Sequence, residues 1–589
     1  MSFFHLCNLS TFKLSNKKTM KKTLLLFAIL FCANQIKSQG FYNIAHAVDS
    51  LYPNDTTEDG PKAKVRRIFK RWDGQINAQG SFSTAAQNFN SFSNNLATHR
   101  SQNTNCSNDF VPTWKEIGPT MELNNANNLV GAGLIHRLTF HPNYGNSSFN
   151  DDQGYRTIYA LSGFGGIWKT KDDGDSWERL NTDHDIPFSN MGNLVIDPIN
   201  PNRMYLTTGT PNGAPDVSYI SLQRDFPLYT TGIYGTDDGG VTWTKINNGI
   251  SPNLIDFGGT IFNLKMDPTN SNNLIFTSTD GVYICKNANA TLNLISWTKD
   301  QNFNFTDTKI QGLTYAYNGS NLEWYVSGVN IYYCINPFAS VPNPWLLASG
   351  TSKNLDLSNG NYFGNVTKKI IQINIINSPF QANNIVYALI YIRERNPDYD
   401  PDLNPNVTPY FYEIAIHKLS IPNNTTTQWQ NILYHSASDY ATGLHSDKIP
   451  FVKSPNGNDF YFGSTHYGSF LNGNFTESYA SNHHADIQGL YIHPNNPTKL
   501  WMCNDGGVSV GSVSTSHYEV FTYKNKGMQA QLLWDFDDSE QDNKYLLAAL
   551  QDNGQQYIGG PLATNWKTAW FGGDGYEVEI FVKTLLMLL

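Results

Sequence analysis

The repeating character of this chain is clearest in two short stretches. Residues 170–177 read Thr-Lys-Asp-Asp-Gly-Asp-Ser-Trp, and residues 236–243 read Thr-Asp-Asp-Gly-Gly-Val-Thr-Trp. An aspartate side chain can accept hydrogen bonds from the free amides of a tight turn, and glycine supplies a positive φ. The closing tryptophan can bury its ring between neighbouring sheets. Because both stretches fit Ser/Thr-x-Asp-x-Gly-x-Ser/Thr-Trp, they predict a recurring β-hairpin turn.

A second recurring feature surrounds these stretches. Turns that contain proline are each followed by a run of β-branched and aromatic residues, which favour strands. The turns are His141-Pro142-Asn143, Asp197-Pro198, Asp267-Pro268, Ser378-Pro379, Ser454-Pro455 and His493-Pro494. Their spacing, roughly 60 residues in the first units, matches a four-stranded unit with its loops. Almost no helical periodicity is present, so the sequence predicts an all-β protein: a β-propeller of about seven or eight four-stranded blades.

The two stretches resemble Asp-box motifs, the hairpin signature of BNR-repeat, sialidase-type propellers. The same turn occurs in sortilin-like propellers and in oligoxyloglucan-hydrolysing glycoside hydrolases. In those families the turn lies at the blade periphery, remote from the ligand face, so the resemblance implies a structural role for the motif. It covers most of the mature chain, most clearly residues 131–250 and 483–576. The matching positions are Thr170, Asp172, Gly174, Ser176 and Trp177, then Thr236, Asp238, Gly240, Thr242 and Trp243.

The N-terminal region has the features of a secretory signal peptide. Met20-Lys21-Lys22 precedes an apolar run at residues 24–33 and a polar end near residue 39, the parts of a signal peptide. A membrane span needs about 20 apolar residues, so this run is too short for one. We therefore expect an exported protein, secreted or at the cell surface, without a transmembrane segment.

The sequence divides into four parts. Residues 1–39 are an N-terminal extension followed by the signal peptide. Residues 40–112 form a polar linker with a short basic helix, and residues 113–581 form the β-propeller. Residues 582–589 break the repeat within a blade and predict a truncated or frameshifted end, which leaves the last blade incomplete. Resembling propellers from Bacteroidetes-type bacteria often carry a C-terminal sorting domain for type IX secretion, and none is visible in this sequence.

Composition excludes several classes of function. The charged residues amount to 15% and the aromatic residues to 13%, which argues against a disordered chain. A net charge of −9 argues against nucleic-acid binding. The chain contains no glycine-rich phosphate loop, no His-Glu-x-x-His zinc motif and no Gly-x-Ser-x-Gly nucleophile elbow.

Acidic residues beside glycines gather near the C-terminus. The candidate ligand or metal residues are His484, Asp486, Asp505, Asp552 and Asp574. Converging carboxylates can bind Ca²⁺ through oxygen ligands, or act as acid and base on a sugar. Asp-Gly and Asn-Gly are also strong hairpin-turn signals, so turn chemistry is the competing interpretation. No other cofactor is indicated.

The resemblance to the oligoxyloglucan hydrolases does not extend to their catalytic residues. Each catalytic aspartate of that family lies two residues before a Gly-Gly pair, and these positions are Gly163 and Asn504 here. Neither residue is an acid, and no sialidase-type arginine motif can be assigned.

Two hypotheses about function follow. The first is a binding or scaffold module for a glycan or a protein, because aromatic residues stack on sugars and anchor interfaces. The alternative is a glycoside hydrolase that acts on a plant-type or other polysaccharide through Asp505, Asp552 and Asp574. The ligand and the oligomeric state are not indicated by the sequence.

Overall fold

The chain divides into two units, Met1–Thr104 and Asn105–Leu589, and the described residues belong to the second. The computed structural model describes residues 132–578 apart from gaps at 164, 183–184, 187–189, 210–229, 256–258, 305–309, 341–342, 349–367, 379, 381–383, 396–409, 422–428, 438–449, 457–458, 464–465, 479–482, 514–519, 539–544, 560–565, 571–574 and 576–577. The predicted signal peptide, the linker at 40–112 and the tail at 582–589 lie outside the described residues.

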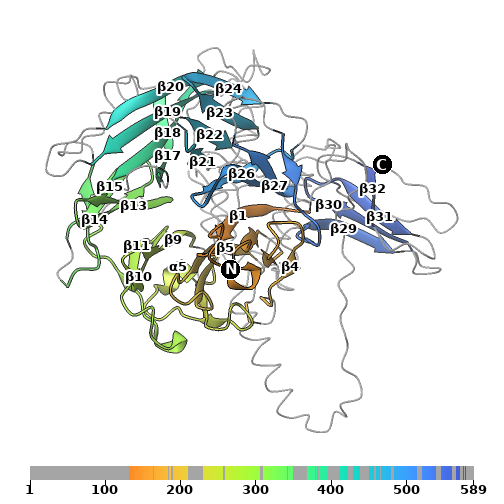
Figure 1. The fold of residues 1–589 in the computed structure, drawn as a ribbon, viewed down its shortest axis with the longest axis horizontal. Helices are drawn as coiled ribbons and strands as arrows, with labels where there is room; N and C mark the ends of the chain where they lie inside the picture. Colours follow the sequence, from red (N-terminus) through yellow and green to blue (C-terminus); the bar gives the residue numbers. More distant parts are fainter. Residues whose placement is uncertain are drawn as a thin grey trace, which may run out of the picture. The chain divides into compact units, whose positions relative to one another are not determined.

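The described strands form eight four-stranded antiparallel sheets, which are numbered here in chain order (Figure 1). Sheet 1 contains β1 (Ile135–Phe140), β2 (Ile158–Ser162), β3 (Ile167–Thr170) and β4 (Glu178–Arg179). Sheet 2 contains β5 (Met191–Ile196), β6 (Met204–Thr208), β7 (Ile233–Thr236) and β8 (Thr244–Lys245). Sheet 3 contains β9 (Ile261–Asp267), β10 (Asn270–Ser278), β11 (Gly281–Cys285) and β12 (Thr298–Lys299). Sheet 4 contains β13 (Gly312–Asn318), β14 (Asn321–Ser327), β15 (Ile331–Ile335) and β16 (Leu346–Leu347).

The remaining sheets follow the same plan. Sheet 5 contains β17 (Lys368–Asn377), β18 (Ile385–Arg395), β19 (Tyr410–Ser420) and β20 (Gln430–Ala437). Sheet 6 contains β21 (Phe451–Lys453), β22 (Phe460–Gly463), β23 (Tyr467–Leu471) and β24 (Asn474–Ser478). Sheet 7 contains β25 (Ile487–His493), β26 (Asn496–Asn504), β27 (Gly507–Ser512) and β28 (Thr522–Tyr523). Sheet 8 contains β29 (Leu533–Asp538), β30 (Tyr545–Leu550), β31 (Gln555–Gly559) and β32 (Lys567–Trp570).

Helical structure is minor in the described part of the chain. It comprises the one-turn helix α5 (Pro252–Ile255) and two short 3₁₀ turns, η2 (Asp151–Gln153) and η3 (Leu292–Leu294). No helix among these residues has the length and apolar character needed to cross a bilayer. The predicted all-β propeller with four-stranded blades is confirmed.

The blades are held together by apolar clusters between consecutive sheets. One cluster joins sheets 1 and 2, and the next five join each later sheet to its neighbour up to sheets 6 and 7. A seventh cluster joins sheet 7 back to sheet 1 through Trp501, Trp168 and Trp177. Sheets 1–7 therefore close a ring, and Figure 1 shows their first strands facing a common centre.

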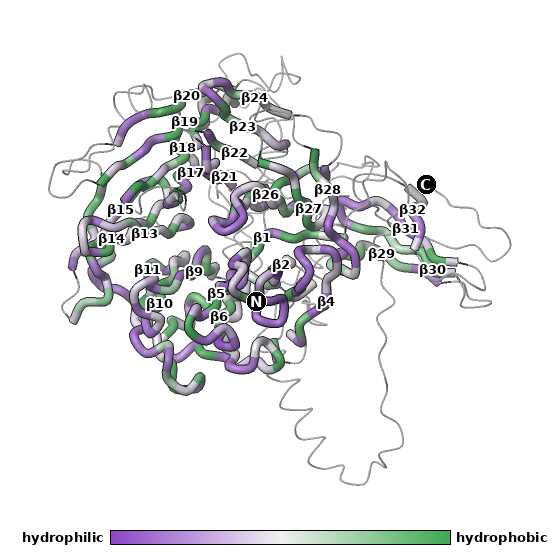
Figure 2. Tube along the Cα trace, in the orientation of Figure 1, coloured by the Kyte–Doolittle hydropathy of each residue, from purple (hydrophilic) through white to green (hydrophobic). Residues whose placement is uncertain are grey.

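The second strand of each blade shows why these segments were recognisable as strands. Alternate side chains of a strand point to opposite faces of its sheet. In β2, Ile158 and Ala160 pack toward sheet 7, whereas Tyr159 and Leu161 pack toward sheet 2. A strand that is buried on both faces must be apolar along its whole length. Figure 2 shows such apolar segments around the ring.

Sheet 8 lies outside the seven-sheet ring. Its described apolar residues form two small clusters, one on each face, in which no described side chain of sheets 1–7 takes part. The segment that leads into it is tied to the start of the ring, because Ala530 donates its amide to the Ala132 carbonyl at 2.9 Å. The predicted range of seven or eight blades thus resolves into seven sheets in a ring plus one further sheet.

The proline turns connect the first and second strands of six sheets. In each turn the side chain before the proline accepts the backbone N–H of the residue after it. The distances from nitrogen to acceptor run from 2.8 to 3.3 Å for His141, Asp197, Asp267, Ser378, Ser454 and His493. Different side chains therefore perform the same local task in successive blades.

Candidate functional site

The sequence-predicted carboxylates lie at opposite ends of the blades. In a four-stranded meander, the first and third turns share one end of the sheet, and the second turn lies at the other end. Asp172 and Asp238 lie in third turns, beside the first turns: Asp173 N–H bonds to the Arg156 carbonyl and Gly239 N–H to the Asn202 carbonyl. Asp505 and Asp552 lie in second turns. The structure therefore separates the two groups of candidates.

The turn at residues 170–177 is organised around the Asp172 carboxylate. It accepts the Thr170 hydroxyl at 2.6 Å, the Ser176 amide at 2.9 Å and the Ser176 hydroxyl at 2.5 Å. Gly174 has a φ of 85° and donates its amide to the Thr170 hydroxyl at 3.0 Å. Burial opposes ionisation of Asp172, but the hydrogen bonds from Ser176 and Thr170 outweigh it and lower its pKa.

The turn at residues 236–243 repeats this geometry. Asp238 accepts the hydroxyls of Thr236 and Thr242 at 2.7 and 2.6 Å, and Gly240 has a φ of 94°. Burial opposes ionisation here as well, but the bonds from Thr242 and its neighbours lower the pKa of Asp238 to about 2. Trp243 packs in the cluster between sheets 1 and 2.

The tryptophan position persists where the aspartate is missing. Trp177 donates its indole N–H to the Lys524 carbonyl of sheet 7 at 2.6 Å. Trp297 and Trp345, which lack the acidic turn, donate theirs to Ile246 at 2.9 Å and to Asp300 at 2.9 Å, each in the preceding sheet or its connection. These side chains act as contacts between blades.

The C-terminal candidates meet where sheet 7 touches the second turn of sheet 8. The His484 Nε2 atom lies 2.9 Å from the Asp552 carbonyl oxygen, and Asn553 donates its amide to the Asp505 carbonyl at 3.1 Å. The Asp505 carboxylate accepts the Gln488 amide at 2.9 Å. The structure therefore brings His484, Asp505 and Asp552 together, mainly through backbone atoms.

The other members of this cluster stand apart. Asp486 adopts a left-handed turn conformation with a φ of 59°, as does Asp552 with a φ of 58°. Asp574 lies outside the described residues. Within the described ranges, no group of three or more His, Cys, Asp or Glu side chains is placed to hold a metal ion. Asn504, which the sequence resemblance predicts at the position of a catalytic aspartate, is fully buried and donates its side-chain amide to the His484 carbonyl at 3.1 Å.

A cavity of about 400 Å³ lies among the first strands of sheets 1, 3, 4, 5, 6 and 7, at the centre of the ring. None of the candidate residues predicted from the sequence lines it. We call it the axial cavity. The polar and charged lining residues are His136, Arg137, Asn263, Lys265, Gln311, Thr314, Gln372, Asn374, Asn377, Lys453 and Gln488. Among the described residues, no aspartate or glutamate lines it.

β-bulges in the first strands shape the wall of the axial cavity. A β-bulge re-aims a side chain by inserting one residue into the pairing. The pairing of β1 with β2 shifts at His136, that of β9 with β10 at Phe262, and that of β25 with β26 at Gln488. All three bulged residues line the axial cavity. A polar residue that interrupts an apolar first strand, as in Ile135-His136-Arg137-Leu138, is the sequence signal that marks such a position.

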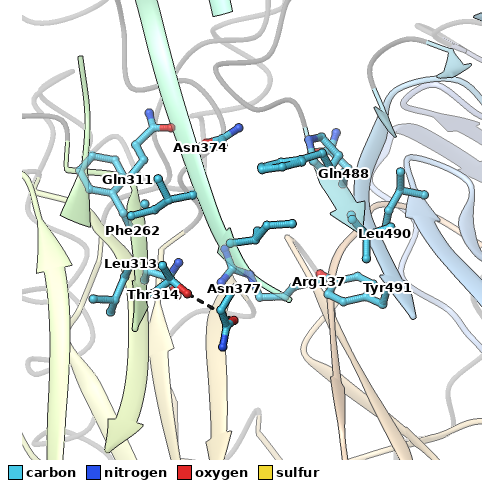
Figure 3. A pocket seen from close by; sticks show the side chains of 18 of the residues that line it. Arg137, Phe262, Gln311, Leu313, Thr314, Asn374, Asn377, Gln488, Leu490 and Tyr491 are labelled. Carbon is cyan, nitrogen blue, oxygen red and sulfur yellow. Dashed lines mark hydrogen bonds between the residues drawn. The ribbon is translucent and has the colours of Figure 1, made fainter. Parts of the chain in front are cut away.

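Amide side chains gather at one end of the axial cavity. Figure 3 shows Gln311, Asn374 and Gln488 at the upper end and Arg137, Thr314 and Asn377 further down. The buried Gln372 amide nitrogen donates to Gln311 and, at 2.6 Å, to Asn374. The Gln372 Oε1 atom has no hydrogen-bond partner among the described residues. Gln372 thus holds an unused acceptor within the cavity wall.

Two cations line the same cavity. Arg137 donates one N–H to Asn193 of sheet 2. Lys265 has no hydrogen bond or ion pair with any described residue. Burial, with the neighbouring Arg137 charge adding to it, lowers the pKa of Lys265 to about 8. Burial also lowers the pKa of Arg137. The wall of the axial cavity therefore contains both the unpaired Gln372 acceptor and two cations, Arg137 and Lys265, without an anionic partner among the described residues.

Comparison with solved structures finds similar chains at low sequence identity. An ancestral GH74 enzyme is 13% identical over 77% of this chain and 56% of its own, with a TM-score of 0.44. A GH74 enzyme from Niastella koreensis is 15% identical over 77% and 62%, with a TM-score of 0.46. The GH74 xyloglucanase from Xanthomonas campestris is 12% identical over 72% and 59%, with a TM-score of 0.33. This chain therefore spans less than two thirds of each of these proteins.

No protein-family model and no curated protein matches the chain.

Proposed function

We propose that the protein is an exported β-propeller that binds a glycan in its axial cavity and does not hydrolyse it. The observation that carries this proposal is the Gln372 Oε1 acceptor, which lies in a buried side chain and lacks a donor among the described residues. A buried acceptor without a donor is costly, typically by about 1–3 kcal/mol. The oxygen is buried as well as unpaired, so a ligand O–H group removes this cost only when the Gln372 amide turns toward the cavity.

The neighbouring amides favour a ligand with many hydroxyl groups. Each Gln or Asn side chain offers both a carbonyl acceptor and N–H donors, which complement sugar hydroxyls. Gln372 fixes the orientation of Gln311 and Asn374 by donating to both. A cavity of about 400 Å³ admits a sugar unit or the end of a chain, within the ~300–1,000 Å³ of small-molecule sites. A folded protein surface cannot enter it, so a glycan is favoured over a protein ligand.

Binding without hydrolysis is favoured by what the carboxylates contact. Glycoside hydrolysis requires two carboxyl groups, one on each side of the scissile bond. The described residues that line the axial cavity include no carboxyl group. Asp505 is held by Gln488, and the Asp552 carboxylate accepts the Gln551 amide at 3.0 Å. These contacts support turn chemistry for both residues.

Export is the remaining part of the proposal. It is supported by the signal-like residues 20–39, where a basic start precedes a short apolar run. The ligand would then be an extracellular or surface glycan.

Binding to an oligosaccharide array, followed by calorimetry, tests the proposed function. The Gln372→Met variant keeps the side-chain length but removes both the acceptor and the amide that orients Gln311 and Asn374, so glycan affinity is expected to fall at least tenfold. Gln301→Met changes an exposed glutamine outside the cavity and should bind like the wild type. Wild-type affinity retained by a folded Gln372→Met protein would contradict the proposal.

Reducing-sugar release separates binding from hydrolysis. We expect no release by the wild-type protein from any polysaccharide that it binds. Release that disappears in Asp505→Asn, Asp552→Asn or Asp574→Asn would establish the hydrolase alternative instead.

A further inference from the structure

We infer that the ligand of the axial cavity is an acidic sugar, whose carboxylate or sulfate group is bound by Arg137 and Lys265. This inference rests on the proposed function and adds the chemical class of the glycan. The two anionic groups share one chemistry: an oxyanion with several acceptor oxygens, attached to a unit that carries hydroxyl groups.

Lys265 provides the first argument. Its ammonium group carries three donors, and no described residue accepts any of them or forms an ion pair with it. It belongs to β9, the first strand of sheet 3, and borders the cavity rather than the outer surface. An enclosed cation without a partner is unfavourable unless a counter-charge or solvent reaches it. The cavity is the space from which an anion can reach Lys265.

Arg137 provides the second argument from a different strand. A guanidinium group carries five N–H donors in a planar fork that suits bidentate binding of oxyanions. One donor binds the Asn193 side chain, which orients the group, and the described residues supply no further acceptor. Arg137 on β1 and Lys265 on β9 line the same cavity, so both groups are available to a ligand that occupies it.

The described part of the cavity wall supplies no negative charge to these groups. Its charged residues are Arg137, Lys265 and Lys453, and none of the described lining residues is acidic. The charge of Lys453 is directed to the Ser454 carbonyl at 2.7 Å. The whole chain carries a net charge of −9, so a cavity with cations alone is opposite in sign to the molecule. Such a concave cationic site attracts anions from solution.

The same cavity therefore presents two complementary demands. The Gln372 acceptor requires an O–H or N–H donor, and the two cations require acceptor oxygens. Inorganic sulfate offers acceptor oxygens but no donor. A neutral sugar offers donors but no anion. A sugar that carries a carboxylate or a sulfate ester meets both demands in one molecule.

Isothermal titration calorimetry on the full chain tests this inference with four probes. They are a neutral gluco-oligosaccharide, an oligogalacturonide, a sulfated galacto-oligosaccharide and sodium sulfate. We expect one of the two acidic oligosaccharides to bind at least tenfold more tightly than the neutral one, and which of them does so identifies the anionic group. The affinity for it should fall between 50 and 300 mM NaCl, whereas neutral binding should not change.

Two variants and a control locate the effect. Lys265→Met keeps the apolar stem and removes the charge, and it should lose at least tenfold in affinity for the acidic oligosaccharide and nothing for the neutral one. Lys265→Arg should retain most of the affinity. Lys245→Met, on the exposed outer strand β8, should bind like the wild type. If Lys265→Met does not fold, Arg137→Gln serves as the charge-removing variant with the same expectation.

Each contrary outcome has a separate meaning. Equal affinities for neutral and acidic sugars, unaffected by Lys265→Met, would overturn the acidic-sugar inference and leave glycan binding standing. Sulfate that binds as tightly as the sulfated sugar would also overturn it, because the sugar would then contribute nothing. No binding of any oligosaccharide by folded protein would overturn the proposed function itself.

Discussion

His141 and His493 occupy equivalent positions, at the turn between the first and second strands of sheets 1 and 7. In both, the Nδ1 atom accepts the backbone N–H of the residue two positions later, at 3.1 and 3.2 Å. An accepting nitrogen must be unprotonated. Burial, with the Lys169 charge adding to it, lowers the pKa of His141 to about 4. Burial alone lowers the pKa of His493 to about 4.

These turns predict acid sensitivity of the fold. The ordinary histidine pKa is about 6.5, so the unfolded chain binds more protons than the folded one between pH 6.5 and 4. The stabilising contribution is present above pH 6.5 and is lost as the pH falls toward 4, on the order of 1 kcal/mol per histidine at pH 5. Urea unfolding at pH 7 and pH 5 measures this loss.

Replacing a turn histidine with the aspartate found in neighbouring blades tests whether the histidine causes the loss of stability at low pH. Asp197 and Asp267 perform the same acceptor role in sheets 2 and 3. His141→Asp should therefore keep the turn and reduce the loss of stability between pH 7 and 5, whereas Asp197→Asn should leave that loss unchanged. A loss in His141→Asp as large as in the wild type would contradict this explanation.

Asp172 tests the structural role that we propose for the acidic turns. Its carboxylate accepts three hydrogen bonds within its own turn. We expect Asp172→Ala to lower the free energy of unfolding by about 1–3 kcal/mol, with unchanged glycan affinity. Chemical denaturation and calorimetry on the same sample measure both quantities. A loss of glycan binding without a loss of stability would place Asp172 at the ligand instead.

Lys265 predicts a pH dependence of ligand binding. Because its pKa is lowered to about 8, it loses its proton between pH 7 and 9, and affinity for an acidic sugar should fall by up to about tenfold. The other titratable groups at the cavity are His136, Arg137, Lys453 and Tyr491. Burial also lowers the pKa of Lys453 to about 8; the Asp459 charge opposes this shift and the Lys418 charge adds to it. Burial raises the pKa of Tyr491.

Lys265→Arg distinguishes these groups. Arginine stays protonated throughout this pH range, so calorimetry should show nearly constant affinity from pH 7 to 9 in the variant. A decline as steep as that of the wild type would assign the pH dependence to Lys453 instead.

Among the secondary-structure elements, second strands were the most predictable and first strands the least. Second strands such as β2 and β6 are buried along their whole length, because both faces meet another sheet. They therefore appear as apolar and aromatic runs that end in small hydroxyl residues, Ser162 in β2 and Thr207 and Thr208 in β6. First strands carry the cavity lining, and bulges at His136 and Gln488 break their alternation. A cavity built from one or two residues per blade leaves no local motif for sequence reasoning to detect.

Sheet 8 should behave differently from the other sheets in hydrogen exchange. The strands of sheets 1–7 are packed between neighbours, whereas the clusters formed by the described residues of sheet 8 contain no described side chain of the ring. Local opening is easiest where few apolar contacts are lost. We expect amides of β30 and β31 to exchange at least tenfold faster than those of β2 and β10, as measured by mass spectrometry on the intact chain. Equal protection would show that sheet 8 is packed as firmly as a blade of the ring.

For the molecule as a whole, the number of blades was predictable and their grouping was not. Repeated turns and tryptophans count the units along the chain, but closure depends on which units touch. The ring is closed by a cluster that contains Trp501 of sheet 7 and Trp177 of sheet 1, and by the bond from Trp177 to the Lys524 carbonyl, between residues more than 300 positions apart in the chain. Neither the closure nor the position of sheet 8 outside the ring follows from the order of the repeats.

The cluster of positive charge in the axial cavity was also not predictable from the order of residues. The chain is acidic overall, and its sequence gives no basic cluster around Arg137 or Lys265. The two cations come together because β1 and β9 both face the centre of the ring. The predicted acidic cluster, by contrast, includes His484, Asp505 and Asp552, which are adjacent to glycine-rich turns visible in the sequence.

The crystal structure of the protein with the acidic oligosaccharide that it binds most tightly is the decisive measurement. We predict a sugar in the axial cavity, with a hydroxyl group donating to Gln372 Oε1 and an anionic group contacting Lys265. A sugar bound instead between His484, Asp505 and Asp552, with no sugar in the axial cavity, would contradict this account.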